Sequence, residues 1–372
     1  MVGRVDTDHT GSGRHDAPDS PLRRHLERYA GDLGQVAGIR RATLRGGMQQ
    51  GLAIAEIDNG GGLSLTVLEN ACLDILSMRW KGLNLGFLGP AGPVHPALIH
   101  PENGAFGEGF RGGMLYTCGL ANIGPAGVIE GVTHPTHGRV ARLAAEDVWT
   151  DRRWHASGCT LVVGGTMREA ALFGNTLTLE RRVETECFSN RITVTDVVRN
   201  AGFAPVPLFL LHHVNFGYPF LEEGVRILIP TERTEPRDAA AETGVARCGV
   251  MDPPMDGAQE QVFYHHVRPD AEGMARVGIV NDARALAVIV RYDAAVQPVL
   301  VQWKSACSGS YVLGIEPSTC TVAGRASLAK TGTLPPMLEP GESRRFVLQM
   351  EVVEGHEAIG SIGTIGESEA GT

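Results

Sequence analysis

Residues 177–202 read LTLERRVETECFSNRITVTDVVRNAG and carry the pattern that decides the fold. Apolar and polar residues alternate along both halves of this stretch, and a period of two is typical of strands that bury one face. Ser189 and Asn190 lie between the halves, where small polar residues favour a turn. The stretch therefore predicts two antiparallel strands joined by a tight turn.

The same signal recurs on both sides of this hairpin. Residues 52–69, LAIAEIDNGGGLSLTVLE, predict a second hairpin around Asn59-Gly60-Gly61-Gly62. Further β-prone runs lie at residues 206–220, 225–230, 285–293, 299–304, 311–317 and 344–354. Residues 21–32 carry Leu22, Leu26 and Tyr29 at helical spacing and predict one short helix. Long helical stretches are missing from the pattern.

The composition agrees with a fold made of strands and turns. The 372 residues include 48 Gly and 21 Pro, which favour tight turns. Beyond about residue 40 the sequence has neither a clean linker nor a repeat of fixed period. We therefore expect an all-β fold with few short helices, in which residues 21–357 form one large antiparallel β-sandwich. Residues 1–20 and 358–372 are expected to be a disordered and a flexible tail.

Charge and hydropathy exclude several classes of partner. The formal net charge is −9, and nucleic-acid binding needs a basic surface. No apolar run approaches the ~20 residues of a membrane span, and the first 20 residues lack the apolar segment of a secretory signal. The seven cysteines form no C-x-x-C pair, which favours free thiols in a reducing compartment. We predict a cytoplasmic protein that binds neither nucleic acid nor membrane.

Two turn segments place polar residues where a ligand could be held. In Phe110-Arg111-Gly112-Gly113-Met114, the glycines let the backbone approach a ligand while Arg111 donates paired hydrogen bonds; the alternative is a turn with a solvated arginine. In His134-Pro135-Thr136-His137-Gly138-Arg139, proline and glycine disfavour the helix face that two metal-binding histidines would need. A single histidine that binds a ligand is favoured there.

Two further segments place polar residues on predicted strands. On the strand that follows VPLFLL, His213, Asn215 and Gly217 share one face, while His212, Val214 and Phe216 share the other. The first face suits the floor of a polar pocket, although a satisfied buried histidine is the alternative. Glu316 interrupts the apolar strand YVLGIEP, and carboxylates are rarely buried without a partner or a function. A paired structural glutamate is the alternative here.

Arginine, histidine and glutamate together suit proton transfer on a neutral polyol. A glutamate can act as a base near neutral pH, and a histidine titrates close enough to that range to act as an acid. Neither the phosphate-binding pattern G-x-x-x-x-G-K-[ST] nor the nucleophile pattern G-x-S-x-G occurs. The sequence therefore favours acid–base chemistry over phosphoryl or acyl transfer.

Five short motifs resemble those of one family and occur in the same order. They are Arg111-Gly112-Gly113, His137-Gly138 with Ala141-Arg142, His213-x-x-Phe216, Gly314-Ile315-Glu316 and Leu338-Glu339-Pro340-Gly341-Glu342. On these motifs the chain, from about residue 30 to 355, resembles the galactose-mutarotase-like superfamily of aldose 1-epimerases, and most closely its aldose-1-epimerase-like branch DUF4432. The resemblance implies a β-supersandwich and an isomerase that interconverts sugar anomers without a cofactor or a metal.

The resemblance also implies roles for individual residues. Glu316 would take the proton from the anomeric hydroxyl, and His213 would protonate the ring oxygen. The residues expected to bind the sugar are Arg111, His137, Arg139, Asn215, Trp303 and Lys304. A sugar-selecting acid could be Asp74, Asp256 or Glu260. The asparagine–arginine pair of the galactose enzymes is not found at the Arg111 turn, so galactose itself is not supported.

Several alternatives stay open at this point. Another sugar isomerase, epimerase or lyase could use the same fold, and so could a sugar-binding protein without catalysis. A metal would find its donors among His134, His137, His265 and His266. The expected partner is a small sugar or sugar derivative, and the chain could be a monomer or a homodimer.

Overall fold

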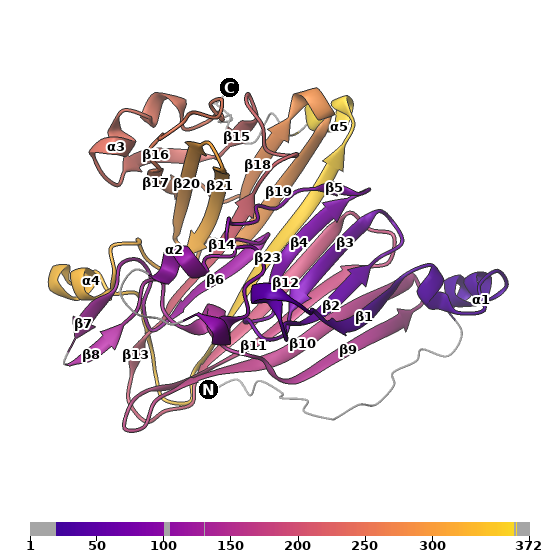
Figure 1. The fold of residues 1–372 in the computed structure, drawn as a ribbon, viewed down its shortest axis with the longest axis horizontal. Helices are drawn as coiled ribbons and strands as arrows, with labels where there is room; N and C mark the ends of the chain where they lie inside the picture. The colour runs from indigo at the N-terminus through magenta and orange to yellow at the C-terminus, as the bar shows by residue number, and fades with distance from the viewer. Residues whose placement is uncertain (1–19, 100–104, 130, 361, 363–372) are drawn as a thin grey trace.

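The computed structural model describes residues 20–99, 105–129, 131–360 and 362. Antiparallel sheets make up most of it, and the helices are short (Figure 1). Within these residues no helix has the length and hydropathy that crossing a membrane would need.

The largest sheet is built around residues 177–202. Its strands lie in the order β15-β18-β19-β23-β12-β11-β10-β9. The predicted hairpin forms β11 and β12, with Leu179 paired with Val198 and the turn at Ser189 and Asn190. The strands are β9 (Glu146–His155), β10 (Gly158–Ala170), β11 (Thr176–Glu186), β12 (Arg191–Asn200), β15 (Arg226–Leu228), β18 (Met274–Asn281), β19 (Leu286–Asp293) and β23 (Ser343–Glu354).

Two further sheets pack against the large one. The first has the order β1-β2-β3-β4-β5, and the second, called here the site sheet, has the order β16-β17-β20-β21-β14-β6. The strands of the first are β1 (Gly38–Thr43), β2 (Ala53–Asp58), β3 (Leu63–Leu68), β4 (Asp74–Trp80) and β5 (Leu83–Asn84). Those of the site sheet are β6 (Leu115–Leu120), β14 (Phe209–Phe216), β16 (Thr231–Pro236), β17 (Gln261–Val267), β20 (Val299–Cys307) and β21 (Ser310–Ser318).

Short elements connect and cover the sheets. Small two-stranded sheets pair β7 (Gly127–Ile129) with β8 (Val132–His134) and β13 (Val206–Pro207) with β22 (Met337–Leu338). The α-helices are α1 (Pro21–Glu27), α2 (Ala105–Gly109), α3 (Ala239–Glu242), α4 (Arg325–Thr331) and α5 (His356–Gly360). The 3₁₀ turns are η1 (Leu33–Gln35), η2 (Gly47–Gln49), η3 (Pro96–Leu98), η4 (Val140–Arg142), η5 (Val245–Arg247) and η6 (Asp282–Arg284).

The main hydrophobic core lies between the sheets. It joins residues of β2–β4, of the large sheet and of one face of the site sheet, such as Leu65, Leu179 and Leu210. A second cluster covers the opposite face of the site sheet and includes Phe209, Leu211 and Val301. Strand alternation therefore sends even-numbered residues of β14 into the main core and odd-numbered ones to the outer face. Figure 1 shows α2 beside β6 and β14, and the β7–β8 hairpin beside α4, both away from α1.

The structure confirms most of the fold predicted from the sequence. The architecture is all-β and antiparallel, β2 and β3 form the hairpin around Asn59, and α1 occupies part of the predicted helix. α5 continues the chain past residue 357, and Ile359 and Ile362 pack in a small cluster with Val280 and Ile289. Most of the two predicted tails lies outside the described residues, so the predicted boundaries at 20 and 357 remain predictions.

Candidate active site

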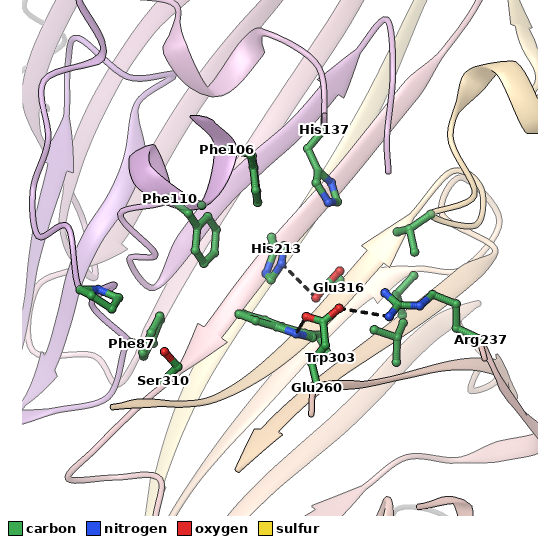
Figure 2. Close-up of a pocket in the computed structure, with 15 residues that line it drawn as sticks. Phe87, Phe106, Phe110, His137, His213, Arg237, Glu260, Trp303, Ser310 and Glu316 are labelled. Atoms are coloured by element: carbon green, nitrogen blue, oxygen red, sulfur yellow. Dashed lines mark hydrogen bonds and ion pairs between the residues drawn. The ribbon is translucent and has the colours of Figure 1, made fainter. Parts of the chain in front are cut away.

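A cavity of about 340 Å³ lies on the outer face of the site sheet. Its floor comes from β14, β20 and β21, which contribute His213, Trp303 and Glu316. Its walls come from α2 and from the turns that carry His137 and Glu260. The volume falls within the usual range for small-molecule sites. Figure 2 shows these side chains converging on His213 and Glu316.

His213 and Glu316 form the centre of this cavity. The antiparallel register that pairs Leu211 with Ser318 and Val214 with Ile315 sets His213 opposite Glu316. Nε2 of His213 lies 3.1 Å from Oε1 of Glu316, within ion-pair distance but without the alignment of a hydrogen bond. The two residues are only 6% and 2% exposed. Nδ1 of His213 and Oε1 of Glu316 have no hydrogen-bond partner among the described residues.

Burial shifts the pKa values of the two groups in opposite directions. It raises the pKa of Glu316 well above its usual value, and the nearby Glu260 carboxylate adds to this shift. Burial, with a smaller contribution from His137, lowers the pKa of His213 to about 3. The raised pKa of Glu316 and the lowered pKa of His213 both favour a pair that holds one proton. That proton can lie on Glu316, which leaves both groups neutral, or on His213, which gives an ion pair.

His137 is held at the edge of the cavity by a tight turn. Its φ of 55° and the φ of 77° at Gly138 are both left-handed. The turn packs so closely on β6 that a Cβ at residue 138 would clash with the carbonyl oxygen of Gly119. The imidazole stacks on Phe106 with ring centroids 5.0 Å apart, and 6.4 Å separate its centroid from that of His213. Burial lowers the pKa of His137 to about 4, so the ring is neutral at neutral pH.

Aromatic side chains form much of the remaining wall. Phe106 and Phe110 stack with centroids 5.3 Å apart, and Phe110 lies 5.6 Å from His213 and 5.9 Å from Trp303. The Trp303 ring meets His213 edge-on at 5.3 Å. Aromatic faces of this kind can pack on the C–H face of a sugar ring. In Figure 2, Phe106 and Phe110 lie on one side of the His213–Glu316 pair and Arg237 lies on the other.

An ion pair, Arg237–Glu260, occupies the more exposed part of the cavity. NH2 of Arg237 donates to Oε1 of Glu260 over 3.1 Å, and Nε1 of Trp303 donates to Oε2 of the same carboxylate over 2.7 Å. Nε of Arg237 donates to Asp238 over 2.8 Å. The side chains of Arg237 and Glu260 are 33% and 50% exposed, so the pair lies where the cavity meets solvent.

Only some of the predicted site residues line the cavity. The lining contains four of them: Glu316, His213, His137 and Trp303. Of the three acids predicted as candidates for sugar selection, Glu260 also lines the cavity. Asp74 is buried between the sheets, and Asp256 is exposed outside the lining. Four residues expected to contact the sugar are not in the lining: Arg111, Arg139, Asn215 and Lys304.

Each of these four side chains is held elsewhere by a specific contact. Arg111 is buried, 3.0 Å from Asp74, and donates to the carbonyl of Ala141. Lys304 follows Trp303 on β20 and points to the other face, where it pairs with Asp252 at 2.6 Å. Asn215 is fully buried and donates to the carbonyls of Gly113 and His213. Arg139 is exposed and donates to the carbonyl of Thr133.

A buried polar network supports the site sheet from the core side. Arg181 of β11 lies 2.8 Å from Asp74 and 2.6 Å from Asp196, and Asp196 accepts from Nε2 of His212 over 2.9 Å. His212 contacts Gln297, which donates to the carbonyl of Pro317 next to Glu316. Because Arg111 pairs with Asp74, the network extends from Arg111, which follows Phe110, to Pro317, which follows Glu316. It fixes the sheet beneath both walls of the cavity.

The lining side chains that were not selected from the sequence include Phe87, Phe106, Phe110 and Arg237. Phe106 and Phe110 are four residues apart across the short α2 helix, a spacing that marks one helix face but is too brief to stand out. Arg237 follows β16 and carries no motif. Nothing in the described part of the chain groups three or more His, Cys, Asp or Glu side chains as a metal site would.

Comparisons with known proteins agree with the motifs. The model of a family described as a domain of unknown function, DUF4432, matches residues 49–352. A solved structure from Klebsiella pneumoniae, of a protein provisionally assigned as an aldose 1-epimerase, shares 25% identity with a TM-score of 0.82 and covers 89% of this chain and 88% of its own. No curated protein matches the sequence.

More distant structures have the same fold. A galactose mutarotase-like protein from Clostridium acetobutylicum matches with a TM-score of 0.58, and the galactose 1-epimerase of Lactobacillus acidophilus with 0.53. Both are 13% identical and cover 86% of this chain and 100% of their own. The protein therefore has the galactose mutarotase-like fold, as the motifs predicted.

Proposed function

The chain belongs to the DUF4432 family, and from that premise we propose that it is an isomerase that interconverts the anomers of a free sugar without a cofactor. The observation that supports this function is the His213–Glu316 pair, a buried acid and a buried base 3.1 Å apart in a cavity of about 340 Å³. A cyclic sugar carries two oxygens on its anomeric carbon, the hydroxyl and the ring oxygen. Two adjacent proton-transfer groups suit these two adjacent oxygens.

Ring opening and reclosure would use each group twice. The Glu316 carboxylate takes the proton of the anomeric hydroxyl while the His213 imidazolium gives its proton to the ring oxygen, and the bond between the anomeric carbon and the ring oxygen breaks. Rotation about C1–C2 presents the other face of the aldehyde. The hydroxyl attacks that face and returns its proton to His213, while protonated Glu316 gives its proton to the carbonyl oxygen. No proton or electron is gained or lost overall.

The proton content of the pair matches this mechanism. The reactive form needs one proton in the pair, placed on His213, and the raised pKa of Glu316 favours retention of that proton by the pair. A polar substrate that hydrogen-bonds both groups would favour the ion-pair form over the neutral form. His137, neutral and with an unpartnered buried Nδ1, could hydrogen-bond a sugar oxygen beside the pair.

Exchange spectroscopy by NMR tests the proposal. The rate of interconversion of α and β anomeric protons is measured over a panel of aldoses, with and without protein. The protein should accelerate exchange for at least one sugar. Glu316→Gln and His213→Asn should each lower that rate about 10²- to 10⁴-fold, the usual contribution of one proton-transfer group.

Matched variants outside the cavity control for damage to the fold. Glu169 is a partly buried carboxyl and His265 a buried imidazole; burial shifts their pKa values as it does those of the pair, and neither lines the cavity. Glu169→Gln and His265→Asn should keep the full rate. The proposal is contradicted if the protein accelerates anomer exchange for none of the sugars. A product with a new stereocentre would instead assign the His213–Glu316 pair to an epimerase that acts on carbon.

A further inference from the structure

The charges that line the cavity balance one another. Among its described lining residues, Arg237 is the one lysine or arginine, and Glu260 and Glu316 are the carboxyl groups. The histidines His137 and His213 are neutral at neutral pH, because burial lowers their pKa values to about 4 and about 3. Burial raises the pKa of Glu316, which favours its neutral form, and Arg237 and Glu260 carry opposite charges that cancel.

Two of the five N–H groups of Arg237 are already committed to carboxylates. Its NH2 is held by Glu260 inside the cavity, and its Nε is held by Asp238, which lies outside the lining. The Glu260 carboxylate is fixed in turn by the indole N–H of Trp303. A carboxylate or phosphate that bound the remaining N–H groups of Arg237 would lie beside the Glu260 carboxylate, and like charges at close range repel.

The opposite wall is largely aromatic. Phe87, Phe106 and Phe110 present rings and no hydrogen-bond donors, so an anion pressed against them would lose its hydration without compensation. A neutral sugar differs in both respects. Its hydroxyls can donate to the free lone pairs of Glu260, and its C–H face can pack on the rings.

We propose that the Glu260–Arg237 pair selects an uncharged free sugar and excludes sugar acids and sugar phosphates. This inference rests on the proposed function, because it names the substrate class of the same site. Glu260 is then a specificity-determining residue, and Arg237 is the group that fixes its charge and orientation. Because both side chains are partly exposed, the selection should weaken as added salt screens the charges.

The experiment compares each neutral sugar with its own acid in four proteins: wild type, Glu260→Gln, Arg237→Gln and Asp238→Asn. The probes are D-glucose with D-glucuronate and glucose 6-phosphate, and D-galactose with D-galacturonate. Anomer exchange and direct binding by NMR titration are both measured at low ionic strength. Thermal unfolding of each variant checks that it is folded.

Removal of the negative charge of Glu260 and removal of the positive charge of Arg237 should change the preference for neutral sugars in opposite directions. Wild type should prefer the neutral member of a pair by about tenfold or more, since 1.4 kcal/mol corresponds to tenfold. Glu260→Gln exposes Arg237 and should reduce or reverse this ratio, whereas Arg237→Gln leaves Glu260 unbalanced and should increase it. Asp238→Asn also removes a carboxylate from Arg237, but outside the cavity, and should leave the ratio near that of wild type.

The outcomes separate this inference from the proposed function. If wild type exchanges anomers of neutral sugars and their acids equally well, or prefers the acids, the selectivity is wrong while the mutarotase function stands. If neutral sugars bind selectively but no anomers exchange, the selectivity holds and the catalytic function is wrong. If no probe is bound or exchanged by wild type, both are overturned.

Discussion

The neighbouring residues His212 and His213 of β14 have different roles, one structural and one in the proposed reaction. His212 faces the core, where its Nε2 donates to Asp196 and its Nδ1 contacts Gln297, and it completes a satisfied network. His213 faces the cavity, and its Nδ1 has no hydrogen-bond partner among the described residues. The alternation of β14 predicts this difference from the sequence alone, because successive side chains of a strand point to opposite faces.

The pH dependence of the proposed reaction follows from the opposed pKa shifts. The pair loses its single proton only when pH rises through the raised pKa of Glu316, and it gains a second only below the pKa of about 3 of His213. The enzyme-dependent exchange rate should therefore fall as pH rises through the raised pKa of Glu316, and it should show no fall on the acidic side until pH approaches 3. Removal of the Glu260 charge lowers the pKa of Glu316, so Glu260→Gln should move the alkaline fall to lower pH.

This profile is measured by exchange NMR with the buffer rate subtracted at each pH. Asp238→Asn serves as the control, since Asp238 does not act on the pKa of Glu316. An acidic fall centred near 6.5, the ordinary pKa of histidine, would contradict the account.

A single glycine fixes the position of His137. Gly138→Ala should both unfold at lower temperature and exchange anomers more slowly, because a Cβ there meets the Gly119 carbonyl and displaces the turn. Gly131 is the matched control: its φ of 78° nearly equals the 77° of Gly138, but a Cβ there would meet no atom within 4 Å. Gly131→Ala should cost only the backbone strain of about 1–2 kcal/mol. Equal losses in the two variants would show that steric contact is not the cause.

At the scale of elements, the site depends on how the large sheet holds the site sheet. A buried polar network links them: Arg181 of β11 pairs with Asp196 of β12 and with Asp74 of β4 in the five-stranded sheet. Asp196 in turn accepts from His212 of β14 in the site sheet. Burial alone would raise the pKa of Asp196, but Arg181 and His212 hold it below its usual range. Sequence reasoning selected Arg111 as a sugar ligand because of its glycine neighbours. It could not see that Asp74, 37 residues earlier, holds the guanidinium beneath the cavity.

Removal of Arg181 tests the importance of this network. Arg181→Met leaves two buried aspartates without their shared partner and should lower the free energy of unfolding by about 3–5 kcal/mol. Arg182→Met on the opposite face of β11 is the control and should change it by about 0.5 kcal/mol or less. Urea denaturation of both variants gives the comparison. A loss for Arg181→Met as small as that for Arg182→Met would mean that the network does not hold the sheets together.

The strands themselves could be predicted, but the short helices that complete the site could not. Alternation over β11 and β12 extends over some twenty residues and leaves little ambiguity. α2 has five residues, fewer than two helical turns, so the helix that positions Phe106 against His137 has almost no periodic signal.

At the scale of the whole molecule, the cavity forms only when distant parts of the chain fold together. Its polar residues come from positions as far apart as His137 and Glu316, and the two groups of the central pair are 103 residues apart in sequence. Motif order identified His137, His213 and Glu316 in advance. Arg237 and Glu260 lie on connections around β16 and β17, whose paths over the sheet depend on packing that no local pattern encodes.

One comparison tests the central claim most directly, that His213 and Glu316 transfer protons to and from a sugar. It is the anomer-exchange rate of the best neutral sugar, measured at saturation for wild type, Glu316→Gln and Glu169→Gln at the same pH. The account predicts that wild type and Glu169→Gln exchange at the same rate, while Glu316→Gln is about 10²- to 10⁴-fold slower and still binds the sugar. A Glu316→Gln protein that binds and exchanges the sugar as fast as wild type would contradict it.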